Sequence, residues 1–131
     1  MEYILKINNL EKRYKKNIVL KNLNLNLEKG AIYGLVGKNG AGKTTLIRII
    51  SGLQQPTSGN YFLYNTSYQD KSINDIRSKI SAIVEYPAIY MNLTAEENLI
   101  EHYKTLGIPP SNEIKELLNL VGLSNVENEK V

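Results

Sequence analysis

The chain of 131 residues carries 16 Lys and Arg against 13 Asp and Glu, a formal net charge of +3. This mild surplus gives no reason to expect nucleic acid as a partner, because a slightly basic solvated surface explains it. The absence of cysteine excludes a disulfide framework, a cysteine-ligated zinc site and a thiol nucleophile. No apolar stretch approaches the ~20 residues of a membrane span, and the first residues lack an export signal. We therefore expect one globular domain in the cytoplasm.

The first part of the chain predicts strands. Short apolar runs at 3–7 and 18–20 are typical of them. In residues 22–27 Asn alternates with Leu, which predicts a strand with one buried face and one solvated face. Residues 31–36 show no such alternation. This unbroken run predicts a strand buried on both faces, as at the centre of a parallel sheet.

The rest of the chain alternates between helical patterns and short apolar runs. Apolar spacing, capping residues and stop signals predict helices over 43–50, 73–79, 94–106 and 114–121. Apolar runs predict strands over 61–64 and 80–84, the second of them buried. Together with the first strands, this order predicts an α/β fold.

Residues 37–44, Gly-Lys-Asn-Gly-Ala-Gly-Lys-Thr, form a complete phosphate-binding loop of the Walker A kind. Its glycines let backbone N–H groups turn inward, where a Cβ would obstruct the phosphates. Lys43 brings a positive charge to the β- and γ-phosphates, and the Thr44 hydroxyl is offered to Mg²⁺. The apolar strand before the loop and the helix after it are the context that the motif requires. We expect a nucleoside triphosphate to be bound by Gly37, Asn39, Gly40, Ala41, Gly42, Lys43 and Thr44.

The longer string at 33–46 resembles the nucleotide-binding domain of ABC transporters, as do residues 51–53 and 56–59. The resemblance covers the whole chain. It implies a P-loop NTPase core with a small N-terminal antiparallel β-subdomain and the start of a helical subdomain, truncated at the C-terminus. The β-subdomain and P-loop core would occupy residues 1–85, and the Q-loop region and first helices residues 86–131.

The resemblance adds two residues to the nucleotide site. The residue that matches Thr45 helps to hold the α-phosphate in the family. Tyr14 lies in the basic stretch at 12–16, where the family places an aromatic ring that stacks on adenine. Stacking on a base is worth about 1–3 kcal/mol and needs no specific hydrogen bond. From the residues alone, an aromatic side chain in such a stretch is more typical of a solvated turn.

Glu85 follows the run at 80–84, at the place where most ABC domains carry the Q-loop glutamine. In the family this glutamine contacts Mg²⁺ and the membrane subunit, so the resemblance makes Glu85 a candidate metal ligand beside Thr44. With Pro87 and the run at 93–99, it is similar to the bacitracin- and lantibiotic-resistance subgroup of exporters. Two other interpretations stay open. Glu85 is a surface residue that closes a strand, or a catalytic candidate at the end of a degenerate Walker B strand.

Three elements of a working ABC ATPase are missing from the sequence. It contains no Leu-Ser-Gly-Gly-Gln signature, no apolar strand that ends in Asp-Glu, and no switch histidine after one. Asp70 and Asp75 are the only aspartates and lie in a polar segment, while His102, the only histidine, lies in a predicted helix. In the family the missing elements come after the equivalent of Val131. We therefore expect that the chain binds nucleotide and that it does not hydrolyse it alone.

The resemblance also implies cofactors, partners and a location. The cofactors are ATP and Mg²⁺. The partners are a transmembrane permease subunit and, in the full-length protein, a second nucleotide-binding domain at the inner face of the cell membrane. The subgroup implies export of an antimicrobial peptide or drug, although the membrane subunits select the cargo. The alternative from another class is a stand-alone small P-loop nucleotide-binding protein or kinase.

Overall fold

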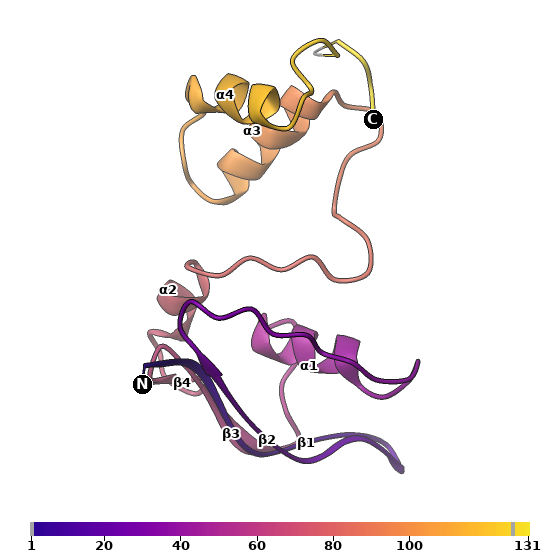
Figure 1. Ribbon diagram of the computed structural model, residues 1–131, viewed down its shortest axis with the longest axis vertical. Helices are drawn as coiled ribbons and strands as arrows, with labels where there is room; N and C mark the ends of the chain where they lie inside the picture. Colours follow the sequence, from indigo (N-terminus) through magenta and orange to yellow (C-terminus); the bar gives the residue numbers. More distant parts are fainter. Residues whose placement is uncertain (1, 127) are drawn as a thin grey trace. The chain divides into compact units, whose positions relative to one another are not determined.

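The computed structural model describes residues 2–126 and 128–131. The chain divides into two compact units between Tyr86 and Pro87, and each unit is described by itself (Figure 1).

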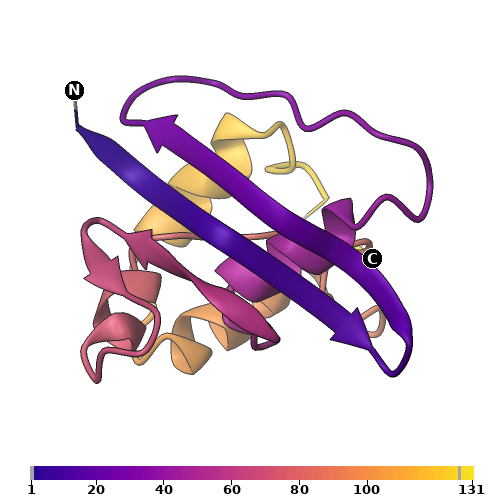
Figure 2. The same cartoon turned by 90° about the horizontal axis from the view of Figure 1, so that it is seen from below.

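The first unit is built on a four-stranded antiparallel sheet. Its strands are β1 (Tyr3–Tyr14), β2 (Asn17–Glu28), β3 (Ser58–Leu63) and β4 (Thr66–Ser67), in the order β2-β1-β3-β4. β1 and β2 form one long hairpin, visible in Figure 2. Along β2 the leucines at 23, 25 and 27 are half-buried and the asparagines between them are exposed. The predicted alternation is therefore confirmed.

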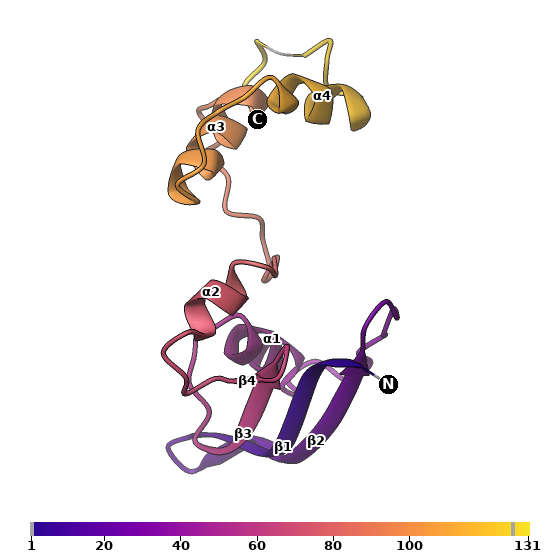
Figure 3. The same ribbon diagram turned by 90° about the vertical axis from the view of Figure 1, so that its left-hand side faces the viewer.

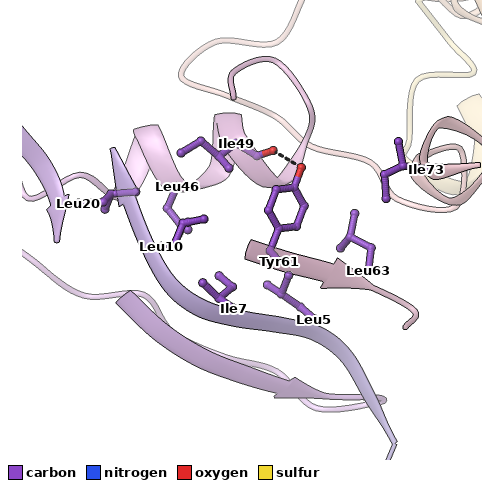
Figure 4. Close-up of a cluster of buried hydrophobic side chains, with 9 residues drawn as sticks. All are labelled: Leu5, Ile7, Leu10, Leu20, Leu46, Ile49, Tyr61, Leu63 and Ile73. Atoms are coloured by element: carbon purple, nitrogen blue, oxygen red, sulfur yellow. Dashed lines mark hydrogen bonds between the residues drawn. The ribbon is translucent and has the colours of Figure 1, made fainter. Parts of the chain in front are cut away.

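Two helices lie on one face of this sheet, α1 (Lys43–Ile50) and α2 (Ile73–Arg77) (Figure 3). α1 buries Leu46 and Ile49, which lie three residues apart and so share a helix face. Apolar side chains from both layers form one core, drawn in Figure 4: Leu5, Ile7, Leu10, Leu20, Leu46, Ile49, Tyr61, Leu63 and Ile73.

Tyr61 joins the sheet to both helices. Its side chain is fully buried, and its hydroxyl donates to the carbonyl oxygen of Ile49 at 2.9 Å (Figure 4). The same hydroxyl accepts a hydrogen bond of 2.7 Å from Nη2 of Arg77, and the ring stacks on Tyr68 with centroids 4.8 Å apart. These contacts fix the end of α1 against β3.

Two of the predicted strands are absent from the described residues. Residues 31–36 and 80–84 form no strand, and the side chains of Ile32, Val36 and Ile83 are 101%, 94% and 76% exposed. The prediction of a buried strand at each place is wrong for this structure. A strand buried on both faces needs a hydrogen-bonding neighbour and covering layers. The four strands described here pair only with one another and supply neither.

The second unit consists of α3 (Ala95–Thr105) and α4 (Glu113–Leu120), which pack against each other. α3 begins with the predicted capping box. The Thr94 hydroxyl accepts from the Glu97 N–H at 3.2 Å, and the Glu97 carboxylate accepts from the Thr94 N–H at 2.8 Å. α4 buries Ile114 and Leu118 from one face. No helix within the described residues combines the length and the apolar character of a membrane span.

The antiparallel sheet with its two helices, and the helical second unit, agree with the fold class inferred from the sequence, a P-loop NTPase core with an antiparallel β-subdomain and the start of a helical subdomain.

Candidate functional site

The glycine-rich loop turns directly into α1. The N–H of Ala41 donates to the carbonyl oxygen of Lys38 at 3.1 Å and closes a turn, while Gly40 and Gly42 have φ values of 82° and 92°. These values lie in the left-handed region, which glycine adopts without the cost of a Cβ. The motif therefore has the backbone conformation that its glycines predict.

The N-terminus of α1 is open to a ligand. Gly42 is the N-cap, and within the described part of the chain no side chain caps this end. The first intrahelical bond runs from the N–H of Leu46 to the carbonyl oxygen of Gly42 at 2.9 Å. The N–H groups of residues 43–45 therefore have no acceptor in the helix and carry the positive end of its dipole. Such an end binds phosphate.

Gly42 also fixes where this helix end lies. A Cβ at position 42 would come within 2.7 Å of Leu20 Cδ2 and 2.8 Å of the carbonyl oxygen of Val19. Both atoms belong to β2. Only glycine allows the loop to approach the strand this closely, so the start of α1 is held against the sheet.

The side chain of Lys43 folds back over the loop. Its Nζ donates to the carbonyl oxygens of Gly37 and Lys38, the second at 2.9 Å. These contacts hold the ammonium group of Lys43 at the loop. When a phosphate binds there, its charged oxygen would replace a backbone carbonyl oxygen as the acceptor of the Lys43 hydrogen bond. Charge-assisted hydrogen bonds of that kind are about twice as strong as neutral ones.

A cavity of about 400 Å³ lies at the loop. Seven of its lining residues belong to the predicted site: Asn39, Gly40, Ala41, Gly42, Lys43, Thr44 and Thr45. Asn17 and Val19, from the beginning of β2, complete the lining. Sequence reasoning missed these two. The only sequence signal for them is their position three and five residues after Tyr14.

Tyr14 is not among the residues that line this cavity. It ends β1, and its hydroxyl donates to Oε1 of Gln54 at 2.6 Å. The Lys12 ammonium lies 5.1 Å from the centre of its ring. The structure thus places Tyr14 beside the segment that follows α1, and its stacking on adenine stays a prediction.

Glu85 is brought to α1 by an ion pair. One carboxylate oxygen lies 3.0 Å from Nη2 of Arg48, and both side chains are partly exposed. Arg48 is four residues after Thr44, so the two share a helix face one turn apart. The structure therefore places Glu85 beside Arg48 and not among the residues that line the cavity, so its role as a metal ligand beside Thr44 stays a prediction.

No group of three or more His, Asp or Glu side chains within the described residues is arranged to hold a metal ion by itself. Asp70 belongs to a local turn. The backbone N–H and the hydroxyl of Ser72 donate to its carboxylate at 2.8 and 2.7 Å and lower the pKa of Asp70 from its ordinary value. Mg²⁺ bound to a nucleotide needs no such cluster, because one or two protein oxygens suffice beside the phosphates. The Thr44 hydroxyl at the cavity fits that requirement.

Comparison with known proteins agrees with this geometry. The chain is 43% identical to the bacitracin transport ATP-binding protein of Bacillus licheniformis over 125 residues, which are 95% of this chain and 40% of that protein. It is 42% identical to the lantibiotic transport ATP-binding protein of Streptococcus pyogenes over 128 residues, 98% of this chain and 54% of that protein. The chain thus spans about half the length of these relatives.

A solved structure described as an ATP-binding subunit of an ABC transporter superimposes with a TM-score of 0.78 at 28% identity, over 97% of this chain and 54% of that one. These likenesses confirm the resemblance and the fold class that the sequence motifs predict. The ABC transporter family model matches residues 20–131. The chain therefore belongs to the ABC transporter family.

Proposed function

We propose that this chain is the nucleotide-binding part of the ATP-binding subunit of an ABC exporter. The observation that carries the proposal is the open N-terminus of α1, which Gly42 holds against β2 at a cavity lined by Lys43 and Thr44. An anion-binding helix end, an ammonium group and a hydroxyl at one cavity are what a nucleoside triphosphate requires.

Several groups of the loop have a role in this proposal. The backbone N–H groups of residues 40 and 42–45 surround the phosphates, whereas the N–H of Ala41 already donates to the carbonyl oxygen of Lys38. Lys43 leaves the Gly37 and Lys38 carbonyls for the β- and γ-phosphate oxygens. Thr45 binds the α-phosphate. Mg²⁺, when bound, neutralises charge between the β- and γ-phosphates. Thr44 and Glu85 are the protein groups proposed to hold it.

The remaining predictions complete the proposal. Residues 1–85 form the β-subdomain with the P-loop core, and residues 86–131 form the Q-loop region with the start of the helical subdomain. In the full-length protein a transmembrane permease subunit and a second nucleotide-binding domain are the partners, at the inner face of the membrane. Relatives named for bacitracin and lantibiotic transport support an antimicrobial peptide or drug as cargo.

Hydrolysis is proposed to need groups that these 131 residues lack. The sequence has no signature motif and no Asp-Glu pair after an apolar strand. Since phosphoryl transfer depends on groups that position water and stabilise charge, the chain alone is expected to bind ATP without turning it over. A single-turnover assay with radiolabelled ATP tests this. Phosphate release that Glu85→Gln abolishes would assign Glu85 a catalytic role instead.

Fluorescent-nucleotide titration tests the binding itself. Lys43→Ala removes a charge-assisted contact worth about 1.5–3 kcal/mol, so affinity for MgATP should fall about ten- to hundredfold. Lys38→Ala is the matched control, because it removes an equal charge from the same loop at a residue that does not line the cavity. Equal affinities of Lys43→Ala and wild type would refute the proposed site.

A further inference from the structure

Asn17 is the one polar residue lining the cavity that neither the Walker motif nor the family resemblance assigns. It opens β2 and lies opposite Tyr14 in the hairpin. Its side chain is exposed and makes no hydrogen bond to another residue in the described part of the chain. Asn24, on the same strand, differs, because its carboxamide donates to the carbonyl of Asn22 and accepts from the N–H of Asn9. The hydrogen-bond donors and acceptor of the Asn17 carboxamide are therefore available to a ligand.

The position of Val19 shows which part of a nucleotide reaches Asn17. Its carbonyl lies against Gly42 at the end of the phosphate loop. Asn17 is two residues earlier on the strand, across a register shift of the hairpin, and both residues line the same cavity. Phosphates bound at the N-terminus of α1 would occupy the Gly42 end. A nucleoside attached to them could then reach Asn17 at the start of β2.

The chemistry of the carboxamide suits a nucleoside. It offers two donors and an acceptor, and both the ribose hydroxyls and the base edge present complementary groups. Stacking by Tyr14 would add affinity without discriminating between bases, so any discrimination must come from a hydrogen-bonding group elsewhere. We propose that Asn17 is a nucleoside-binding residue, which hydrogen-bonds the ribose or the base of the bound nucleotide. This inference rests on the proposed function.

Competition titrations with two ligands test the inference. ATP contains a nucleoside, whereas inorganic tripolyphosphate offers the phosphates alone. Asn17→Ala should weaken ATP about three- to tenfold, the loss of one hydrogen bond, and leave tripolyphosphate unchanged. Asn26→Ala is the matched control, an exposed asparagine on the same strand that does not line the cavity. It should leave both affinities unchanged.

Two further ligands locate the contact. If Asn17→Ala weakens the binding of ATP but not of 2′-deoxy-ATP, the contact is to the ribose. If Asn17→Ala weakens the binding of ATP and 2′-deoxy-ATP but not of GTP, the contact is to the base edge. The inference is overturned if Asn17→Ala binds ATP like wild type, or if it weakens ATP and tripolyphosphate equally. Failure of the proposed function looks different, because wild type would then bind neither ligand.

Discussion

Substitution of the two left-handed glycines of the phosphate loop separates backbone strain from steric exclusion. Gly40 and Gly42 have nearly the same φ, 82° and 92°. An alanine at either position would hold a left-handed conformation that costs about 1–2 kcal/mol. Position 40 has no heavy atom within 4 Å of an added Cβ. Gly40→Ala therefore measures the strain alone.

Gly42→Ala adds a collision to the same strain. The new Cβ would lie 2.7 Å from Leu20 Cδ2 and 2.8 Å from the Val19 carbonyl oxygen. Leu20 is buried in the core and the carbonyl belongs to β2, so neither atom can move aside freely. Overpacking of this kind costs about 1–3 kcal/mol. The total for Gly42→Ala is thus about 2–5 kcal/mol, against about 1–2 kcal/mol for Gly40→Ala.

Urea unfolding followed by circular dichroism gives both values, and tripolyphosphate titration shows whether the helix end still binds an anion. We expect the unliganded Gly42→Ala chain to unfold at clearly lower urea than Gly40→Ala. It should also lose tripolyphosphate binding, since the start of α1 must move away from β2. Equal destabilisation by the two substitutions would refute the argument that Gly42 sets the distance between loop and strand.

Substitutions at three other positions test individual side chains. Tyr61→Phe leaves the Ile49 carbonyl and Arg77 Nη2 without the buried hydroxyl, and should cost about 2–4 kcal/mol in urea unfolding; a cost below about 0.5 kcal/mol would contradict the network. Thr94→Ala removes the cap of α3 and should cost about 0.5–2 kcal/mol, seen as faster amide exchange at the start of that helix, whereas Thr94→Ser should restore protection. Tyr14→Ala should lower the affinities for ATP and GTP alike, whereas Tyr14→Phe should leave both nearly unchanged. If Tyr14→Ala lowers the affinity for ATP alone, pure stacking is excluded.

Local patterns predicted the parts of this molecule that depend on neighbouring residues. The glycines at 40 and 42 specify the loop because the left-handed conformation is a property of single residues. The alternation along 22–27 specifies one wet face, and Thr94 with Glu97 specifies the start of α3. Each of these was confirmed because its physical cause lies within a few residues of sequence.

Features that depend on distant partners were predicted less well. β1 extends to Tyr14, far beyond the predicted run at 3–7, because its polar residues pair with β2 and β3. β2 joins the two runs predicted at 18–20 and 22–27 into one strand. Asn17 enters the cavity only because Gly42 lets the loop approach β2. No pattern in the sequence reports that approach.

The sequence-based prediction and the structure differ most clearly for the apolar run at 31–36. Its composition predicts a buried strand, whereas Ile32 is fully exposed here. Ile32→Ala should therefore change the free energy of unfolding of the 131-residue chain by less than about 0.5 kcal/mol. Ile49→Ala is the matched control. It truncates an isoleucine with no exposed surface in the core and should cost about 2–5 kcal/mol.

Urea unfolding of the two variants beside wild type makes the comparison. A cost for Ile32→Ala as large as that for Ile49→Ala would show that residues 31–36 are buried in solution, and the strand prediction would then be right. A negligible cost for Ile32→Ala would show that residues 31–36 are exposed in the 131-residue chain. The same substitution in a chain as long as the relatives then asks whether further residues bury it, because burial would raise the cost toward that of Ile49→Ala.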